Sequence, residues 1–558
     1  MTRLIECVPN FSEGRDRKVI DAITAEIEGT EGALLLDVDP GRATNRTVVT
    51  FVGPPEAVEE AAFRAIRRAA ELIDMTAHRG EHPRMGATDV CPFVPVMGAT
   101  MEECAEIARR LGRRVGEELG IPVYLYEAAA ARPERRSLAE IRRGEYEALP
   151  RKLADPAWTP DFGPAAFNAR SGATVIGARE FLIAFNINLD TRDKRAANRL
   201  AQELREAGKP LRDENGKLVK DAGGQTVRTP GRFKECRAVG WYIPEYGRAQ
   251  ISINLTNYQV TSIHAVFDAA GEEAARQGLR VTGSELVGLV PLQAILAAGD
   301  HYLRRQGKTT GIPERERIHA AVLSLGLGEI APFDPDQKII EYRYRAGAGG
   351  LRRLPLQALT DELSSESPAP GGGSAAAVCG ALAAALASMV AALAWPKADP
   401  DTQRPAVLGL GERAQALKDW FLEAADRDSA AFNAVLVARR LPRGSTAEGE
   451  ARNRAIAAAN LHATEVPLEV LERAVEALEL ALQAVRSAQP SSVSDAGVAG
   501  ACALACAEGA ALSVAINLPS VEGGVAAGLA ARRDRAIESA RRLAQETASA
   551  VAQRMDRA

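Results

Sequence analysis

The composition of the chain changes sharply near residue 346, and this change constrains the fold more than any other feature. Before it, apolar runs rich in Val and Ile alternate with amphipathic helical segments, whereas after it such runs nearly vanish and Ala becomes abundant. Closely spaced glycines in the stretch 346–350 mark the change, because glycine disfavours regular structure. At 558 residues the chain also exceeds what one hydrophobic core usually serves. The sequence therefore predicts an α+β part followed by a separate all-α helical bundle.

The α+β part is expected to contain two related subdomains. Over residues 182–286 the pattern predicts a strand, a helix, two strands, a helix and a strand, which is the split-βαβ (ferredoxin-like) arrangement. Residues 3–126 give a similar succession, and the polar stretch 208–232 is expected to form an exposed loop or a small hairpin. The predicted multidomain organisation is two split-βαβ subdomains over 1–180 and 181–330, a linker over 331–355 and a helical bundle over 356–558.

The helical part contains long stretches of helix formers. Residues 412–440 and 450–488 contain no Gly and no Pro apart from Pro467, which should kink its helix or mark a boundary. Residues 371–395 carry no charge and are long enough to span a bilayer, but Ala and Gly dominate them, so membrane insertion would be weak. We expect a buried helix of the bundle there.

Charge and cysteine usage exclude several classes of protein. The 69 basic residues are offset by 73 acidic ones, and the net charge of -4 gives no general attraction to nucleic acid or to anionic membranes. The seven cysteines are scattered without a CxxC pair, so we expect reduced thiols. The first 20 residues contain acidic side chains and no apolar core, so a secretory signal is not expected. A cytoplasmic protein is therefore predicted.

Two common kinds of cofactor site are not indicated. The sequence has no GxxxxGK[ST] loop and no GxGxxG turn between a strand and a helix, so no nucleotide cofactor is expected. The segment His78-Arg79-Gly80-Glu81-His82 matches the HxxEH spacing of one class of zinc peptidase. That motif requires a helix, which Gly80 and Pro83 would break, so no metal site is expected.

The stretch from Arg79 to Gly86 is instead expected to be a charged loop that displays a catalytic group. It is punctuated by Gly and Pro and precedes the apolar run 90–96. His82 lies beside a carboxylate and two arginines, which suits proton transfer near neutral pH. A surface histidine in a polar turn is the alternative.

Two further segments of the α+β part could bind ligands. Residues 37–46 place two carboxylates, including Asp39, and two arginines in a predicted strand-to-strand turn, where Arg42 and Arg46 could bind a dicarboxylate through paired hydrogen bonds. A solvated hairpin turn is an equal alternative. The connector Gly163–Gly172 is non-periodic and offers backbone donors and one aromatic face.

In the helical part, candidate groups lie at the starts of helices and within one long helix. Residues 370–374 open an Ala-rich helix with glycines, so backbone N–H groups could receive an anion there or serve only as a flexible cap. Asp426 and Asp428 are two residues apart and cannot share a helix face, so at most one should point inward. Asp495 could contact a ligand or cap the helix that follows it.

With these residues identified, the chain resembles the bifunctional formimidoyltransferase-cyclodeaminase family over essentially its full length. Six segments in the expected order carry the resemblance: Cys7-Val8-Pro9-Asn10-Phe11-Ser12-Glu13-Gly14, Gly80 to Gly86 followed by Asp89-Val90-Cys91-Pro92-Phe93, Gly144-Glu145-Tyr146-Glu147, Phe185-Asn186-Ile187-Asn188-Leu189, Gly283 to Pro291, and Pro370 to Ser374.

The resemblance implies roles for particular residues. The transferase catalytic histidine of the family falls on His82, and the cyclodeaminase catalytic aspartate falls on Asp428. The folate-binding segment falls on Gly163, Pro164, Ala165, Ala166, Phe167, Asn168, Ala169, Arg170, Ser171 and Gly172. Further expected substrate contacts are Asp39, Arg42, Gly372, Gly373, Ser374 and Asp495.

The resemblance also implies the chemistry, which belongs to histidine degradation and folate one-carbon metabolism. Transfer of the formimino group from N-formimino-L-glutamate to tetrahydrofolate, a co-substrate expected to be polyglutamylated, would be followed by cyclisation to 5,10-methenyl-tetrahydrofolate with release of ammonia. A cytoplasmic homo-oligomer with dimeric units is expected. Two alternatives are an active transferase with a non-catalytic dimerisation or folate-holding helical domain, and a non-catalytic folate-binding scaffold.

Overall fold

The computed structural model describes residues 3–42, 44–80, 82–221, 223–348 and 350–556. Its contacts divide the chain into two compact units. The first unit contains Met1–Ala298 and Leu325–Ala348, and the second contains Gly299–Ser324 and Gly349–Ala558. The second unit resumes inside the glycine-rich stretch 346–350, of which Gly349 lies outside the described residues.

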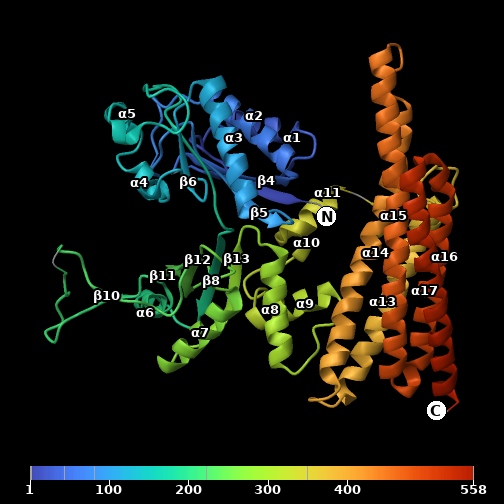
Figure 1. The fold of residues 1–558 in the computed structure, drawn as a ribbon. Helices are drawn as coiled ribbons and strands as arrows, with labels where there is room; N and C mark the ends of the chain where they lie inside the picture. The colour runs from blue at the N-terminus through green and yellow to red at the C-terminus, as the bar shows by residue number, and fades with distance from the viewer. Residues whose placement is uncertain (1–2, 43, 81, 222, 349, 557–558) are drawn as a thin grey trace. The chain divides into compact units, whose positions relative to one another are not determined.

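The first unit begins with a seven-stranded mixed sheet, shown in blue and cyan in Figure 1. Its strands are β1 (Leu4–Cys7), β2 (Asn10–Phe11), β3 (Leu34–Gly41), β4 (Arg46–Gly53), β5 (Thr88–Met97), β6 (Val123–Glu127) and β7 (Thr174–Ala178). The order is β1-β4-β2-β5-β7-β6, with β3 paired to β4. Strands β5, β7 and β6 are parallel, so this sheet is larger and more mixed than the succession of elements over 3–126 predicted.

Helices cover both faces of this sheet. They are α1 (Arg17–Glu28), α2 (Pro55–Leu72), α3 (Met101–Leu119), α4 (Leu138–Arg142) and α5 (Leu149–Leu153). One core joins α1, α2 and α3 to the strands, as Phe63 of α2 and Phe93 of β5 illustrate. A second core joins Ile141 of α4 and Leu149 of α5 to Tyr124 and Val175 of the parallel strands. Burial on both faces explains why β5 is an almost continuous apolar run.

The second sheet has four antiparallel strands in the order β11-β12-β8-β13. Its elements follow the chain as β8 (Ile183–Leu189), α6 (Lys194–Leu204), β11 (Cys236–Ile243), β12 (Arg248–Leu255), α7 (Ile263–Arg276) and β13 (Val281–Val287). The predicted succession of strands and helices is therefore present. Phe185 of β8 packs against Phe267 of α7, and the alternate residue Asn186 bonds to Glu285 on the other face of the sheet.

The polar stretch 208–232 forms the predicted small hairpin. Strands β9 (Lys209–Pro210) and β10 (Arg228–Thr229) pair at its base, and residues 211–221 and 223–227 extend away from the sheet (Figure 1). Four further helices follow the second sheet: α8 (Leu292–Arg305), α9 (Glu314–Leu325), α10 (Pro335–Lys338) and α11 (Ile340–Ala348). Thus α10 and α11 lie within the range expected to be a linker.

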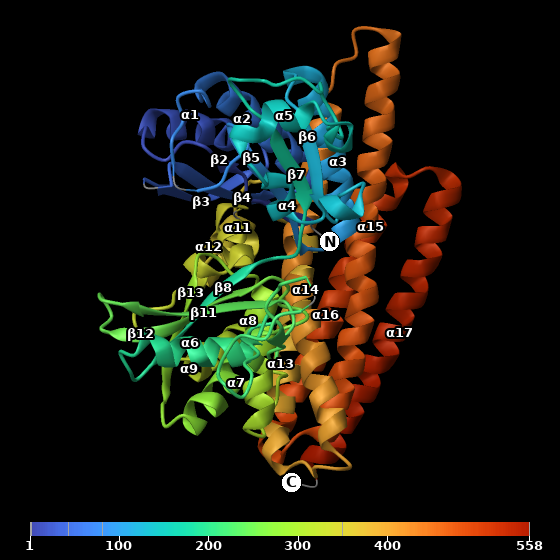
Figure 2. The same ribbon diagram turned by 90° about the vertical axis from the view of Figure 1, so that its left-hand side faces the viewer.

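The second unit is dominated by long helices (Figure 2). They are α12 (Leu356–Leu363), α13 (Gly372–Ala394), α14 (Arg404–Arg439), α15 (Thr446–Ser487), α16 (Val493–Asn517) and α17 (Gly523–Met555). Helices Gly372–Lys397 and Pro490–Ser520 are long and apolar enough to cross a membrane, but about half of each tested segment is buried inside the protein, as in a soluble helical core.

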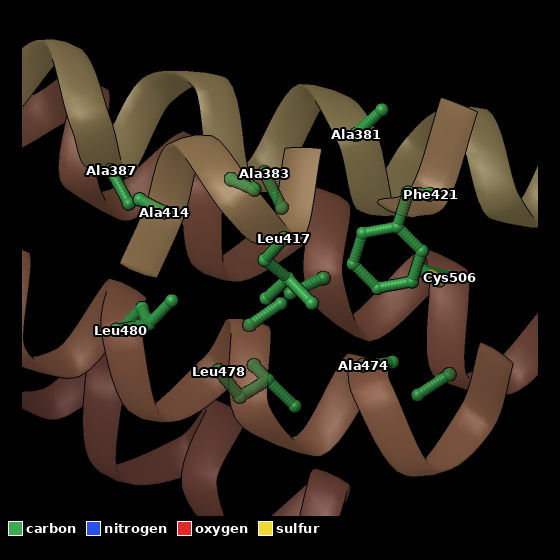
Figure 3. Packing of buried hydrophobic residues seen from close by; sticks show 14 of the residues in the cluster. Ala381, Ala383, Ala387, Ala414, Leu417, Phe421, Ala474, Leu478, Leu480 and Cys506 are labelled. Carbon is green, nitrogen blue, oxygen red and sulfur yellow. The ribbon is translucent and has the colours of Figure 1, made fainter. Parts of the chain in front are cut away.

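Small residues let these helices approach closely. Figure 3 shows Leu417 and Phe421 of α14 among alanines of α13, with Leu478 of α15 nearby. At Gly380 of α13, a methyl group would lie 2.7 Å from the Phe421 ring, so glycine is required for this contact. The abundance of Ala in the sequence is therefore explained by close packing between helices.

Pro467 lies inside α15 and does not mark a boundary. A proline at this position cannot donate to the carbonyl of Ala463, one turn earlier. The Nδ2 group of Asn517 at the end of α16 donates to that carbonyl at 2.8 Å instead. A neighbouring helix therefore satisfies the acceptor that the proline leaves free.

Candidate functional site

The predicted histidine loop lies between α2 and β5, and its described residues, 73–80 and 82–87, belong to no helix or strand. A zinc-peptidase helix is therefore absent from the described part of this segment, whose Glu81 lies outside the described residues. Within the described residues, no group of three or more His, Cys, Asp or Glu side chains is arranged to hold a metal ion.

His78 supports this loop from within the protein. Its buried ring places Nε2 2.8 Å from the carbonyl oxygen of Asn45, and the Nε group of Arg84 lies 3.2 Å from Nδ1. A carbonyl only accepts, so Nε2 donates to Asn45 and Nδ1 accepts from Arg84. Burial lowers the pKa of His78, which is consistent with this neutral form. His78 thus joins the loop to the turn between β3 and β4.

Arg84 connects the loop to the segment Gly144–Glu147. Its nearly buried guanidinium forms ion pairs with Glu147 at 2.7 Å and Glu145 at 3.1 Å. The backbone N–H of Tyr146 donates to the carbonyl of Arg84 at 2.9 Å. One of the segments that carried the family resemblance therefore holds the histidine loop in place.

His82 is partly buried. Its Nδ1 lies 2.6 Å from the carbonyl of Pro83 and therefore donates, which makes Nε2 the acceptor of the neutral ring. Burial lowers the pKa of His82, and the positive charges of Arg46 and Arg142 lower it further, against the opposing effects of the Pro83 carbonyl and Asp89. His82 is therefore an unprotonated base at neutral pH.

A buried carboxylate anchors the end of the loop. Asp89, at the start of β5, is fully buried and accepts from the backbone N–H of Met85 at 3.0 Å. It also pairs with Arg142 at 2.5 Å and with Arg46 at 3.7 Å. The Nε atom of Arg46 and the hydroxyl of Thr88 are buried and have no hydrogen-bond partner within the part of the chain that the structure describes.

The connector Gly163–Gly172 lies against the histidine loop. Gly172 pairs with Gly86, and a methyl group on Gly172 would lie 2.2 Å from the carbonyl of Met85. Gly172 also has a φ of +68°, which favours glycine. The ring of Phe167 lies 5.5 Å from that of Tyr146, whose hydroxyl donates to the carbonyl of Ala169. The structure therefore brings the predicted folate segment and the loop of His82 together.

Asp39 and Arg42 lie at the neighbouring strand end. Strand β3 continues to Gly41, so Asp39 belongs to a strand and not to the predicted turn. Arg42 is exposed, and its carbonyl accepts from Nε of Arg15. The turn itself is packed on the histidine loop, since a methyl group on Gly80 would lie 2.1 Å from the carbonyl of Thr44. Ala43 lies outside the described residues.

In the helical unit, Asp428 of α14 reaches the start of α13. A methyl group on Gly373 would lie 2.3 Å from its Oδ1, and the Ser374 hydroxyl donates to its Oδ2 at 2.8 Å. Burial raises the pKa of Asp428, although the hydrogen bonds from Ser374 oppose the shift. Asp428 and the predicted contacts Gly373 and Ser374 therefore form one site, next to Gly372 in sequence.

Asp426 and Asp495 lie elsewhere. Asp426 accepts from the backbone N–H of Leu351 at 2.6 Å and pairs with Arg352, so it anchors the segment before α12. Helices α13 and α16 are antiparallel, because Ala376 contacts Gly509 whereas Gly380 lies by Cys506. Asp495 is fourteen residues before Gly509, or roughly 20 Å along the helix at 1.5 Å per residue. Within one chain, Asp495 does not join Asp428.

Sequence reasoning missed several members of these sites. Asp89 was noted only as part of a family-like segment, and neither Arg142 nor Ser429, whose hydroxyl lies 3.1 Å from that of Ser374, was singled out. Arg142 is far from Asp89 in sequence and gave no local signal. Asp89 could have been recognised as a charged residue directly before the apolar run 90–96, where a buried charge requires a partner.

Three family models match the chain in sequence. The model described as "Formiminotransferase domain, N-terminal subdomain" matches residues 4–179, "Formiminotransferase domain" matches 184–345, and "Formiminotransferase-cyclodeaminase" matches 355–535. Together they span both units of the structure.

Curated relatives agree with these matches. A formimidoyltransferase-cyclodeaminase of Mus musculus is 45% identical over 93% of each chain, and one of Dictyostelium discoideum is 46% identical over 71% of each. A glutamate formimidoyltransferase of Streptococcus pyogenes serotype M1 is 41% identical over 54% of this chain and 94% of its own length. The chain belongs to the formimidoyltransferase-cyclodeaminase family.

Proposed function

We propose that the chain catalyses two consecutive reactions of folate one-carbon chemistry. The first transfers the formimino group from N-formimino-L-glutamate to tetrahydrofolate. The second cyclises the product, 5-formimino-tetrahydrofolate, to 5,10-methenyl-tetrahydrofolate and releases ammonia. The observation that carries the proposal is the pairing of Gly86 with Gly172, which puts the loop of a neutral histidine beside an open connector suited to a folate.

His82 is the acid/base of the transfer. As N5 of tetrahydrofolate attacks the formimino carbon it loses a proton, and the bond from that carbon to the glutamate nitrogen breaks only when this nitrogen gains one. A neutral imidazole with an accepting Nε2 can take the first proton and deliver it to the leaving nitrogen. The Pro83 carbonyl fixes the required tautomer.

The connector Gly163–Gly172 holds the folate, with exposed backbone groups and the ring of Phe167 as contacts. Asp39 and Arg42, exposed beside the histidine loop, contact the amino-acid donor. A polyglutamylated folate is the expected form of the co-substrate.

Asp428 performs proton transfer in the cyclisation. N10 of the folate attacks the formimino carbon and loses a proton, after which the amine must be protonated to leave as ammonia. A carboxyl group whose pKa is raised by burial is suited to deliver that proton. Gly372, Gly373 and Ser374 contact the substrate at the helix start. Asp495 is left out of this site because it lies at the other end of the contact between α13 and α16.

The alternative in which the helical domain only holds folate or mediates dimerisation makes a different prediction for Asp428. A holding domain has no use for a partly buried carboxyl bonded to Ser374, whereas proton transfer requires one. Incubating the protein with N-formimino-L-glutamate and tetrahydrofolate tests both activities. Glutamate release reports the transfer, and ammonia together with the near-ultraviolet absorbance of methenyl-tetrahydrofolate reports the cyclisation. Glutamate release without ammonia would favour the holding domain.

We further propose the domain limits 1–180, 181–330 and 356–558, with the four-stranded sheet assigned to the ferredoxin-like class. A cytoplasmic homo-oligomer with dimeric units is proposed from the apolar side chains that α13 and α16 leave exposed. On α13 these are Leu382, Met389 and Leu393, which recur on one helix face, and on α16 they include Leu512 and Ile516. Light scattering of the purified protein tests this assembly, and a monomer would contradict it.

A further inference from the structure

Two arginines next to the histidine loop share a single carboxylate. Arg142 of α4 contacts Asp89 through two nitrogens, at 2.5 and 3.3 Å, and Arg46 of β4 lies 3.7 Å from the same side chain. Among the described residues neither arginine has a second acidic partner. With His82 neutral, this cluster carries one surplus positive charge.

One polar atom of the cluster has no hydrogen-bond partner among the described residues. This atom is Nε of Arg46, which is buried. A buried donor without an acceptor is costly. An oxygen-rich anion bound beside Arg46 would supply the acceptor.

The two arginines of the cluster are partly exposed. The side chains of Arg46 and Arg142 are 16% and 15% exposed, whereas Asp89 is completely buried. Asp89 therefore contacts the two guanidiniums from the protein interior. A purely structural ion pair would need only one arginine, and partial burial of a second one is unfavourable unless an anion compensates its charge.

Hydrogen bonds between side chains and the backbone of the histidine loop place this cluster beside the loop of His82. The N–H of Met85, three residues after His82, donates to Asp89. On the other side, the Nδ2 group of Asn45, which precedes Arg46, donates to the carbonyl of Arg79 at 3.1 Å. In the amino-acid donor the formimino group is only a few bonds from a carboxylate, so a donor whose carbon lies at His82 would have a carboxylate within reach of these arginines.

We propose that Arg46 and Arg142, held in place by Asp89, bind one of the two carboxylates of the amino-acid donor. This inference rests on the proposed role of the His82 loop in formimino transfer. A planar guanidinium matches a carboxylate through paired hydrogen bonds, and two of them fix its orientation. Arg42, exposed on the neighbouring turn, remains available for the other carboxylate.

The test compares three donors with full-length protein variants. The donors are N-formimino-L-glutamate and two shortened analogues, N-formimino-γ-aminobutyrate without the α-carboxylate and N-formimino-L-2-aminobutyrate without the side-chain carboxylate. The variants are Arg46→Gln and Arg142→Gln. Arg143→Gln is the matched control, because Arg143 directly follows α4, is exposed and, among the described residues, forms an ion pair only with Glu140 of α4.

We expect each site variant to lower kcat/KM for N-formimino-L-glutamate by about 10- to 100-fold, with the KM for tetrahydrofolate unchanged. This loss should nearly disappear for one of the two shortened donors. The carboxylate that this donor lacks is then the one that the two arginines bind. Equal losses with all three donors, or no loss with any, would overturn the inference.

Folding is monitored independently of the transfer. Cyclisation of supplied 5-formimino-tetrahydrofolate reports the helical unit, and circular dichroism reports the whole chain. If a Gln variant is unfolded, Arg46→Lys and Arg142→Lys preserve the charge next to Asp89 and should show a smaller loss with the same dependence on donor. Wild-type protein without transfer from N-formimino-L-glutamate would refute the proposed function itself, before any variant is compared.

Discussion

At the scale of single residues, the two histidines of the loop have different roles because their hydrogen bonds differ. His78 uses both ring nitrogens within the protein, whereas His82 uses only Nδ1 among the described residues. Only His82 therefore retains a nitrogen for a substrate. Burial and the positive charges of Arg46 and Arg142 lower the pKa of His82, whereas the negative charge of Asp89 raises it; the lowering is the larger effect.

This shift predicts the pH dependence of transfer. A base with a lowered pKa stays unprotonated to a lower pH, so the acid limb of kcat/KM should lie below the ordinary histidine pKa of about 6.5. His82→Ala should reduce the rate by ~10²–10⁴ and remove this limb. Initial rates of glutamate release from pH 5 to 8 measure both. A limb above the ordinary pKa, or near-normal transfer by a folded His82→Ala variant, would contradict the assignment.

Arg42 makes a separate prediction. Lys supplies a positive charge without the planar fork of Arg, so Arg42→Lys should raise the KM for N-formimino-L-glutamate and leave that for tetrahydrofolate unchanged. Arg17→Lys is a suitable control, since Arg17 is exposed on α1 and pairs with Asp21. Steady-state kinetics with each substrate varied in turn provide the measurement. Unchanged KM values for both substrates would remove Arg42 from the site.

At the scale of elements, the sequence predicted those helices and strands whose formation depends mainly on neighbouring residues. The strands and helices of the second sheet, the hairpin within 208–232 and the long Ala-rich helices were predictable because their periodicities are unambiguous. Strands β5 and β6 were also predictable from their apolar runs, but β7 and its parallel pairing with both were not, because β7 follows the long connector and its pairing depends on residues distant in sequence. For the same reason the cluster of Arg46, Asp89 and Arg142 appears only in the folded chain.

Pro467 lies inside α15, although a proline usually breaks a helix, because Asn517 of the neighbouring helix α16 donates to the carbonyl that the proline leaves free. Asn517→Ala should lower the free energy of unfolding by about 1 kcal/mol, because it leaves the Ala463 carbonyl without its donor. In a Pro467→Ala background the restored backbone N–H can serve that carbonyl, so the same substitution should cost less. Urea unfolding of proteins with and without Asn517→Ala, in the wild-type and the Pro467→Ala backgrounds, measures the difference between the two free-energy costs.

Asn460→Ala is the control for this cycle. Its Nδ2 group makes a longer and exposed hydrogen bond, 3.3 Å to the carbonyl of Ser520, so its removal should have little effect. Equal costs of Asn517→Ala in both backgrounds would show that Asn517 does not compensate for the proline.

At the scale of the whole molecule, the candidate sites for the two reactions belong to different compact units. His82 and its partners lie in the first unit, and Asp428 with Gly373 and Ser374 lies in the second. The two family models for formiminotransferase match residues 4–179 and 184–345, and the formiminotransferase-cyclodeaminase model matches 355–535, so the two units also carry separate family matches. Each site is therefore expected to function when the other is disabled.

The most direct test of this account is the Asp428→Asn variant, supplied with N-formimino-L-glutamate and tetrahydrofolate. Asp419→Asn, an exposed change on the same helix, is the control. We predict that Asp428→Asn releases glutamate at the wild-type rate but produces no ammonia, so that 5-formimino-tetrahydrofolate accumulates. Continued ammonia release would move the catalytic role away from Asp428, and equal loss of both activities in a folded variant would contradict the independence of the two sites.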